Sequence, residues 1–170
     1  MSQIKDILTA AQEALQRIDG TGDFETDLGD RVYLNLRGDV RTEADGLQYL
    51  EITQGLPGTR RLAANVMESG LSDQAVLRLL IFATSVAVTD GTDDDAATEQ
   101  ARLLEQDIRR AMYERMQLPL STAAPGVQEQ CYYVTWVDSE PIGLYLDELG
   151  RIVFVVQFDI IYAATAFLEV

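Results

Sequence analysis

The sequence predicts an α+β fold, a mostly antiparallel mixed sheet of about five to six strands with two amphipathic helices packed on one face. Three observations support this. Apolar residues fill every second position from Ile152 to Tyr162, a period typical of a strand with one buried face. Segments 2–19 and 96–116 repeat apolar residues at helical spacing. Short turns between the later strands favour antiparallel pairing. The length of 170 residues fits one domain, residues 1–170.

The N-terminal quarter is predicted as a helix, a loop and a strand. We expect the helix to begin after an N-cap at Ser2 and to end at Asp19, because Gly20 stands where helices usually stop. The Gly- and Asp-rich stretch 21–30 is predicted as a loop with Phe24 as its one apolar anchor. Alternating Val32, Leu34 and Leu36 then predict a half-exposed strand over 31–37.

The next region contains the least regular pattern of the chain. A strand is predicted over 47–54, and Gly55-Leu56-Pro57-Gly58 is expected to break it. Residues 59–72 show no clear period, so we predict a mobile loop over 55–75. Loops of this length in compact domains are usually functional or mobile.

The second half of the chain is predicted as a central strand, a helix and three further strands. Residues 76–89 are apolar on both parities, which favours a strand buried on both faces. The helix over 96–116 carries Glu105 and Arg109 at the favourable i,i+4 spacing. Strands are predicted over 132–137, 142–146 and 151–162, with the turn 148–150 before the last of them.

Composition argues against most kinds of enzyme. The chain has no histidine, and Lys5 is its only lysine, so a Ser–His pair, a Ser-x-x-Lys pair and a P-loop are excluded. Cys131 cannot form an internal disulfide or a zinc site by itself, and its aromatic neighbours predict a buried thiol, which fits a reducing compartment. We therefore predict no catalytic residue, no cofactor and no metal site, and a protein that is not an enzyme.

Two acidic groups are candidate sites. Asp90, Asp93, Asp94 and Asp95 lack the spacing of a calcium loop, and aspartates at a helix start are better explained by capping. Asp147 and Glu148 could act as an acid/base pair, but adjacent residues on a turn rarely face one substrate. A carboxylate-dependent hydrolase stays open as a weak alternative.

The net charge and the positions of the basic residues indicate which kinds of partner the chain can bind. With 28 acids against 13 bases the net charge is −15, which disfavours tight binding to a nucleic-acid backbone and leaves DNA mimicry open, although simple solubility is the commoner cause. Arg60 and Arg61 form an adjacent basic pair in the predicted loop, together with Leu56 and Pro57. On so acidic a chain, these four residues are a candidate interface with a neighbouring subunit or partner.

No apolar run reaches the length of a membrane helix, and no signal peptide is recognised at the start of the sequence, so no membrane contact is expected.

Three elements of the chain form a common layout: the helix Ile4 to Ile18 running into Asp19-Gly20-Thr21-Gly22 and a strand; the strand 76–89 leading through an acidic turn into the helix 96–116; and the strand 132–137 with Asp147-Glu148-Leu149-Gly150-Arg151 and the long final strand. This layout resembles that of the tail terminator (tail completion) proteins of long-tailed bacteriophages. The resemblance is one of pattern, and segment 59–75 does not take part in it.

The resemblance implies a virion structural protein that is assembled in the host cytoplasm and located in the tail. Such proteins form a ring, usually a hexamer, that ends the polymerisation of the tail tube at its head-proximal end. Its partners would be copies of itself, the tail tube protein and the head–tail connector protein, while DNA passes through the lumen without specific binding. The alternatives are another head–tail connector or stopper protein, and an acidic DNA-mimic binding module.

Overall fold

A computed structural model describes residues 3–35, 47–61, 73–87, 94–117, 131–139, 145–146 and 151–164. Within these ranges the chain forms two helices and six strands. In chain order they are α1 (Gln3–Leu15), β1 (Val32–Leu34), β2 (Tyr49–Arg61), β3 (Asp73–Ala87), α2 (Asp94–Gln117), β4 (Cys131–Ser139), β5 (Tyr145–Leu146) and β6 (Arg151–Ala164).

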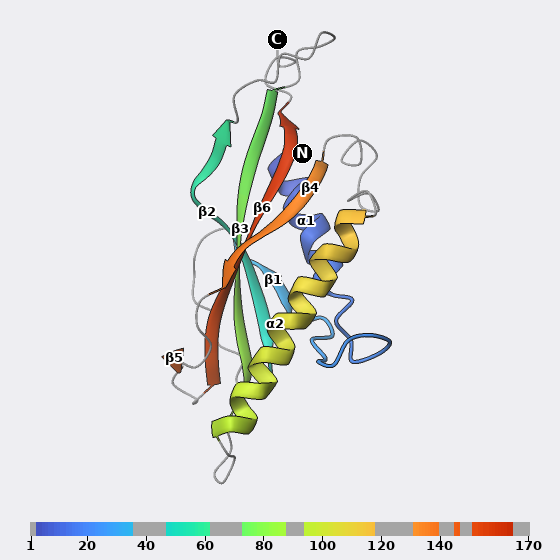
Figure 1. Cartoon of the computed structure of the whole chain (residues 1–170), viewed down its shortest axis with the longest axis vertical. Helices are drawn as coiled ribbons and strands as arrows, with labels where there is room; N and C mark the ends of the chain where they lie inside the picture. The colour runs from blue at the N-terminus through green and yellow to red at the C-terminus, as the bar shows by residue number, and fades with distance from the viewer. Residues whose placement is uncertain are drawn as a thin grey trace.

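All described strands belong to one sheet, in the order β1-β2-β3-β6-β4, and the short β5 also pairs with β6. The long strands follow the longest axis of the molecule and twist strongly along it (Figure 1). Every neighbouring pair is antiparallel except β1 and β2, which run parallel. The predicted α+β fold with a mostly antiparallel mixed sheet is confirmed.

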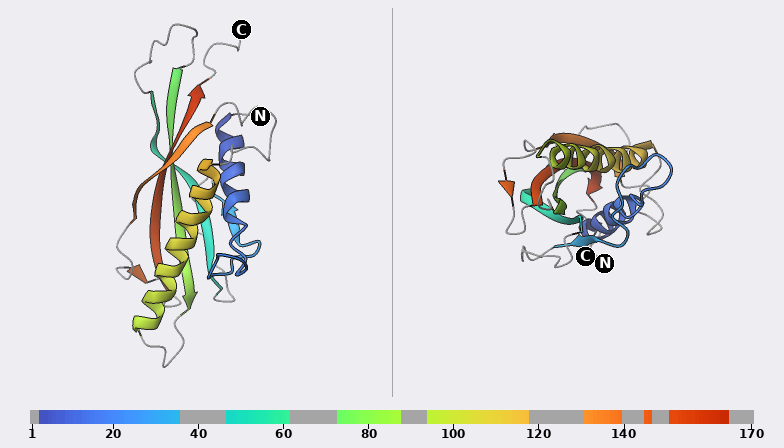
Figure 2. Two further views of the ribbon diagram at one scale, coloured as in Figure 1. Left: turned by 45° about the vertical axis from the view of Figure 1, so that its right-hand side comes forward. Right: turned by 90° about the horizontal axis from the view of Figure 1, so that it is seen from below.

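Both helices cover the same face of this sheet, which we call the inner face (Figure 2). The period of two in the strands and the helical stripes meet there in one hydrophobic core. Each large aliphatic or aromatic side chain that is fully buried stabilises the fold by about 1.5–3 kcal/mol. The core includes Ile7, Leu8, Ala11 and Leu15 from α1, Leu50 and Ile52 from β2, Leu77, Leu79, Ile81 and Ala83 from β3, Ala101, Leu104, Ile108 and Met112 from α2, and Ile152, Phe154, Val156, Phe158 and Ile160 from β6.

The first helix is shorter than predicted. It ends at Leu15 rather than Asp19, because the backbone then tightens into a turn in which Ile18 N donates to Leu15 O over 3.1 Å. Ile18 is nevertheless fully buried, as its spacing from the apolar residues of the helix predicted. Gly20, with φ at +71°, reverses the chain after this turn.

The prediction that Gly55-Leu56-Pro57-Gly58 breaks a strand is wrong. β2 continues through this segment to Arg61, and the extra residues form an irregularity in its pairing with β3. Gln54 pairs with Leu79 and Thr59 pairs with Leu77, so β2 advances five residues while β3 advances two. Strands commonly accept glycine and proline at such irregularities. The predicted mobile loop 55–75 is therefore strand over 55–61 and from 73 onward, and residues 62–72 lie outside the described ranges.

The last strand confirms the predicted period of two, although two residues of the opposite parity, Arg151 and Val155, are also buried. Residues 152, 154, 156, 158 and 160 are buried on the inner face as expected. Arg151, on the opposite parity, is also fully buried, with its guanidinium 5.2 Å from the centre of the Tyr49 ring. It lies at a register shift in the β3–β6 pairing, where Ile152 N donates to the Ser85 hydroxyl over 3.2 Å. This bulge places Arg151 against β2 rather than in solvent.

The other predicted elements are present with shifted ends. The central strand and the second helix each begin earlier than predicted, at Asp73 and Asp94, and Arg109 lies 3.9 Å from Glu105 in the expected ion pair. The short strand before the last turn is reduced to β5. Three predicted features lie outside the described residues: the acidic turn with Asp90 and Asp93, the pair Asp147 and Glu148, and the N-cap Ser2.

Candidate assembly surfaces

β2 has a partner strand on both sides over only part of its length. On the outer side, β1 pairs with Leu50 to Ile52, and Asn35 N adds a hydrogen bond of 2.9 Å to Ile52 O. Beyond that point no described strand borders residues 53–61, which we call the outer β2 edge. An unpaired row of backbone donors and acceptors is a template for pairing with another chain.

The four residues predicted as an interface all lie on the outer β2 edge. Leu56 and Pro57 fall within the irregular part, and Arg60 and Arg61 form the regular end, where they pair with Val76 and Ala75 of β3. The structure thus brings these residues together on a strand edge rather than on the loop that the sequence predicted.

β4 forms the opposite edge of the sheet. One side of β4 pairs with β6, and no described strand borders its other side. Register shifts between Cys131 and Tyr133 and between Trp136 and Asp138 interrupt its pairing with β6. Irregularities of this kind limit indiscriminate pairing at sheet edges.

The β4 edge is held against α2 by a cation–π contact. The guanidinium carbon of Arg109 lies 4.3 Å from the centre of the Trp136 ring, and Nη1 of Arg109 lies 3.9 Å from a Glu105 carboxylate oxygen. Arg109 thereby fixes β4 relative to the helix behind it. A contact of this type contributes about 0.5–1 kcal/mol where solvent reaches it.

The face of the sheet away from the helices, which we call the outer face, mixes apolar and charged side chains. Phe82 and Val137 are each 37% exposed. Arg78 on β3 and Asp159 on β6 form a two-bond ion pair on the same face, with distances of 2.9 and 3.0 Å. The hydrogen bond to Asp159 and its charge raise the pKa of Arg78 above its ordinary value.

A loop over 19–30 forms a third surface, and its position depends on one buried carboxylate of α2. Oδ2 of Asp107 accepts hydrogen bonds from Glu25 N (2.9 Å), Thr26 N (2.8 Å) and the Thr26 hydroxyl (2.8 Å). Leu28, a residue of the loop itself, is fully buried. Neither Asp107 nor Leu28 was predicted as an anchor from the sequence. Asp107 could have been noticed as a polar residue within the apolar spacing of Leu104, Ile108 and Ala111.

Arg31 and Gln48 tie the end of this loop to the start of β2. Nη2 of Arg31 and Nε2 of Gln48 both donate to Asp27 O over 2.8 Å, and Nε of Arg31 donates to Gln48 O over 2.9 Å. The loop is therefore held at α2 and at β2, so its exposed part is presented on a fixed base.

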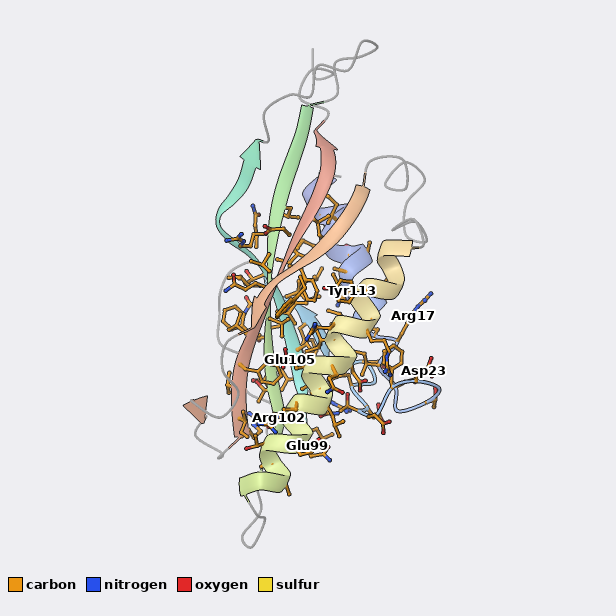
Figure 3. The ribbon with its side chains drawn as sticks, viewed as in Figure 1. Arg17, Asp23, Glu99, Arg102, Glu105 and Tyr113 are labelled. Carbon is orange, nitrogen blue, oxygen red and sulfur yellow. The ribbon has the colours of Figure 1, made fainter. Side chains whose placement is uncertain are left out.

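The exposed part of the loop is acidic. Figure 3 shows Asp23 at the side of the molecule away from β2. The pKa of Asp19 is lowered, first by the hydrogen bond from the Thr21 hydroxyl and then by that from the Thr21 backbone N–H. The exposed acids of the loop are Asp19, Asp23, Glu25, Asp27 and Asp30.

Among the described residues no three His, Cys, Asp or Glu side chains are grouped so that they could hold a metal ion. No helix in the same ranges is long and apolar enough to cross a membrane. The surfaces with identifiable features are therefore two sheet edges, a mixed sheet face and an anchored acidic loop.

Comparisons with known proteins add no assignment. The chain matches no protein-family model, and no curated protein matches it in sequence.

Proposed function

We propose that this protein is a virion structural subunit that forms a ring, of about six copies, at the head-proximal end of a bacteriophage tail tube. The ring ends tube polymerisation and joins the tail to the head connector. The single observation that carries the proposal is the sheet itself: among the described residues, β4 and the outer β2 edge (residues 53–61) each have one side that no strand borders. A subunit with two different exposed edges is suited to head-to-tail assembly, and such contacts form a ring where the rotation between copies closes.

The arrangement of elements supports the link to tail terminators. The opening helix followed by a loop and a strand is present as α1 and β1, and the apolar strand that precedes a long helix is present as β3 and α2. The closing strands are present as β4 and the long β6. These are the elements on which the resemblance in sequence pattern depends.

The charge of the chain fits a lumen through which DNA passes. A net charge of −15 repels the phosphate backbone, so DNA would not adhere to the ring during transit. Its partners under this proposal are the tail tube protein on one side and a connector protein on the other.

The test is the state of assembly. Native mass spectrometry of the purified protein is expected to show a particle of about six times 18.9 kDa, and electron micrographs are expected to show rings that bind to the ends of tail tubes. A chain that stays monomeric at high concentration and ignores tail tubes would exclude the proposal. Rings that bind the connector and not the tube would assign the protein to the connector or stopper class instead.

A second candidate function, an acidic module that mimics DNA, draws on the loop over 19–30. Its exposed carboxylates are held on a fixed base by Asp107 and Arg31. This function predicts a monomer or dimer that binds a DNA-binding protein and loses that binding at high salt. Replacing Asp23 and Glu25 by asparagine and glutamine would abolish such binding, whereas the ring should assemble unchanged.

A further inference from the structure

The four long strands alternate in direction, and this gives the two edges of the sheet opposite polarity. β2, β3, β6 and β4 are neighbours in this order, and each pair is antiparallel. With an even number of alternating strands, β2 and β4 run in opposite directions. Two copies that stand the same way up can therefore place β4 of one beside β2 of the next, and that pairing is antiparallel.

The unpaired parts of the two edges lie at the same level of the sheet. Arg61 of β2 pairs with Ala75, Ala75 pairs with Tyr162, and Tyr162 pairs with Cys131 of β4. In the same way, Gln54 of β2 pairs with Leu79, Leu79 pairs with Phe158, and Phe158 pairs with Trp136 of β4. The outer β2 edge is thus level with the first half of β4, so neighbouring copies need no shift along the strands to bring the edges together.

Charge favours contact between different edges over contact between identical ones. The outer β2 edge, residues 53–61, carries Arg60 and Arg61 and no acid, whereas β4 carries Asp138 and no base. Pairing of two β2 edges about a twofold axis would bring four arginines together. Pairing of β2 with β4 places Arg60 and Arg61 level with Tyr133 and Cys131, so no like charges meet.

We propose that β4 of one copy pairs in antiparallel fashion with the outer β2 edge of the next copy, so that one sheet continues from subunit to subunit around the ring. This inference rests on the proposed ring function and specifies its subunit contact. Each copy offers one edge of each kind, so the contact is heterologous and closes only as a ring. Pro57 has no N–H to donate, which confines the new ladder to the regular segment Thr59 to Arg61.

The native cysteine allows this contact to be tested by crosslinking. Cys131 is the only cysteine and stands level with Arg61, so Arg61→Cys would place two thiols across the proposed contact. A disulfide requires Cα atoms about 4.4–6.8 Å apart, which directly opposed strand residues meet. Mild oxidation is expected to produce a ladder of covalent multimers on a non-reducing gel, ending at the ring size, as each copy has two linkable ends.

Two controls separate this contact from others. Arg61→Cys combined with Cys131→Ser has one thiol per copy and is expected to give no crosslink, whereas a covalent dimer would indicate twofold pairing of β2 and overturn the proposal. In a Cys131→Ser background, Thr59→Cys with Val134→Cys forms a second level pair, since Thr59, Leu77, Ile160 and Val134 are successive partners. This pair is expected to give the same ladder.

The outcomes distinguish this inference from the ring function. Suppose that the wild-type protein forms rings, and that both thiol-pair variants remain folded and assembled when reduced. If neither variant then gives a crosslinked ladder, the sheet continuation is overturned while the ring function stands. A wild-type protein that is monomeric throughout would overturn both. Crosslinking only after tail tube protein is added, and to that protein, would assign the outer β2 edge to a different partner.

Discussion

The inner and outer faces of the same sheet are built from the same strands but differ in what they can do. On β3, Leu79 and Ile81 point to the helices and are fully buried, while Phe82 on the other parity is 37% exposed. On β6, Phe158 is fully buried and its neighbour Asp159 forms an ion pair on the outer face. The inner face therefore sets the stability of the fold, and the outer face and edges are available for other contacts.

The largest expected effect comes from Phe158→Ala on the inner face. Phe158 is fully buried, and its ring meets that of Tyr113 on α2 edge-on, with 6.5 Å between centroids. Truncation leaves a cavity between sheet and helix, so we expect a loss of about 3–5 kcal/mol in the free energy of unfolding. Chemical denaturation measures it. A loss below about 1 kcal/mol would show that the face is not packed as described.

A smaller loss is expected for Asp107→Ala, which removes the polar anchor on the helix side. Three donors of Glu25 and Thr26 lose their acceptor, so we expect about 2–3 kcal/mol in the free energy of unfolding. Hydrogen exchange at the Thr26 amide should rise more than exchange in β6. Asp107→Asn, which keeps one acceptor oxygen, is the matched control and should recover part of the loss; equal loss would contradict the anchoring role.

On the outer face, Phe82→Ala is the counterpart of Phe158→Ala. Because Phe82 is 37% exposed, its truncation should cost no more than about 1–2 kcal/mol. The comparison is made by denaturation of both variants under identical conditions. If the two losses in the free energy of unfolding proved equal, the outer face would be as buried in the assembled protein as the inner one. Dilution should then make the loss for Phe82→Ala smaller than the loss for Phe158→Ala.

The smallest effect is expected for Arg78→Ala, which breaks the ion pair with Asp159. Both partners are accessible to solvent, so the loss should be at most about 1 kcal/mol at low salt and should fade as salt is added. Thermal unfolding at two ionic strengths tests this. A large, salt-independent loss would indicate that another layer covers this pair.

The sequence predicted the parts of the fold in which periodicity and burial agree. Two patterns each predicted one buried face, and both predictions were confirmed. They are the alternation of Phe154, Val156 and Phe158 in β6 and the helical stripe of Leu104, Ile108 and Met112 in α2. Such patterns reveal which side of an element is covered, because the other side carries polar residues.

The errors arose where tertiary pairing overrides a local signal. Gly55 and Pro57 normally interrupt a strand, but β3 provides a continuous partner along β2 and absorbs the extra residues at Gln54 and Thr59. Arg151 lies on the parity opposite to the apolar residues Ile152 and Phe154, but a bulge and the Tyr49 ring bury it. Neither effect is encoded in the neighbouring residues.

The candidate interface stays a prediction. Leu56, Pro57, Arg60 and Arg61 are candidates because an adjacent basic pair lies among them on an acidic chain, and the structure places all four on a strand edge instead of a loop. The level match between the two edges could not be predicted, because it depends on the register between strands that are distant in the chain.

The central pairing of the sheet has a consequence for how the chain folds during synthesis. β3 pairs on one side with β2, its close neighbour in sequence, but its other partner, β6, is made only after α2 and β4. Folding that depends on such distant pairing is slow, in the range of milliseconds to seconds. Until β6 emerges from the ribosome, the apolar strand β3 keeps one side open to misassociation, so the nascent chain has the greatest need for a chaperone in that interval.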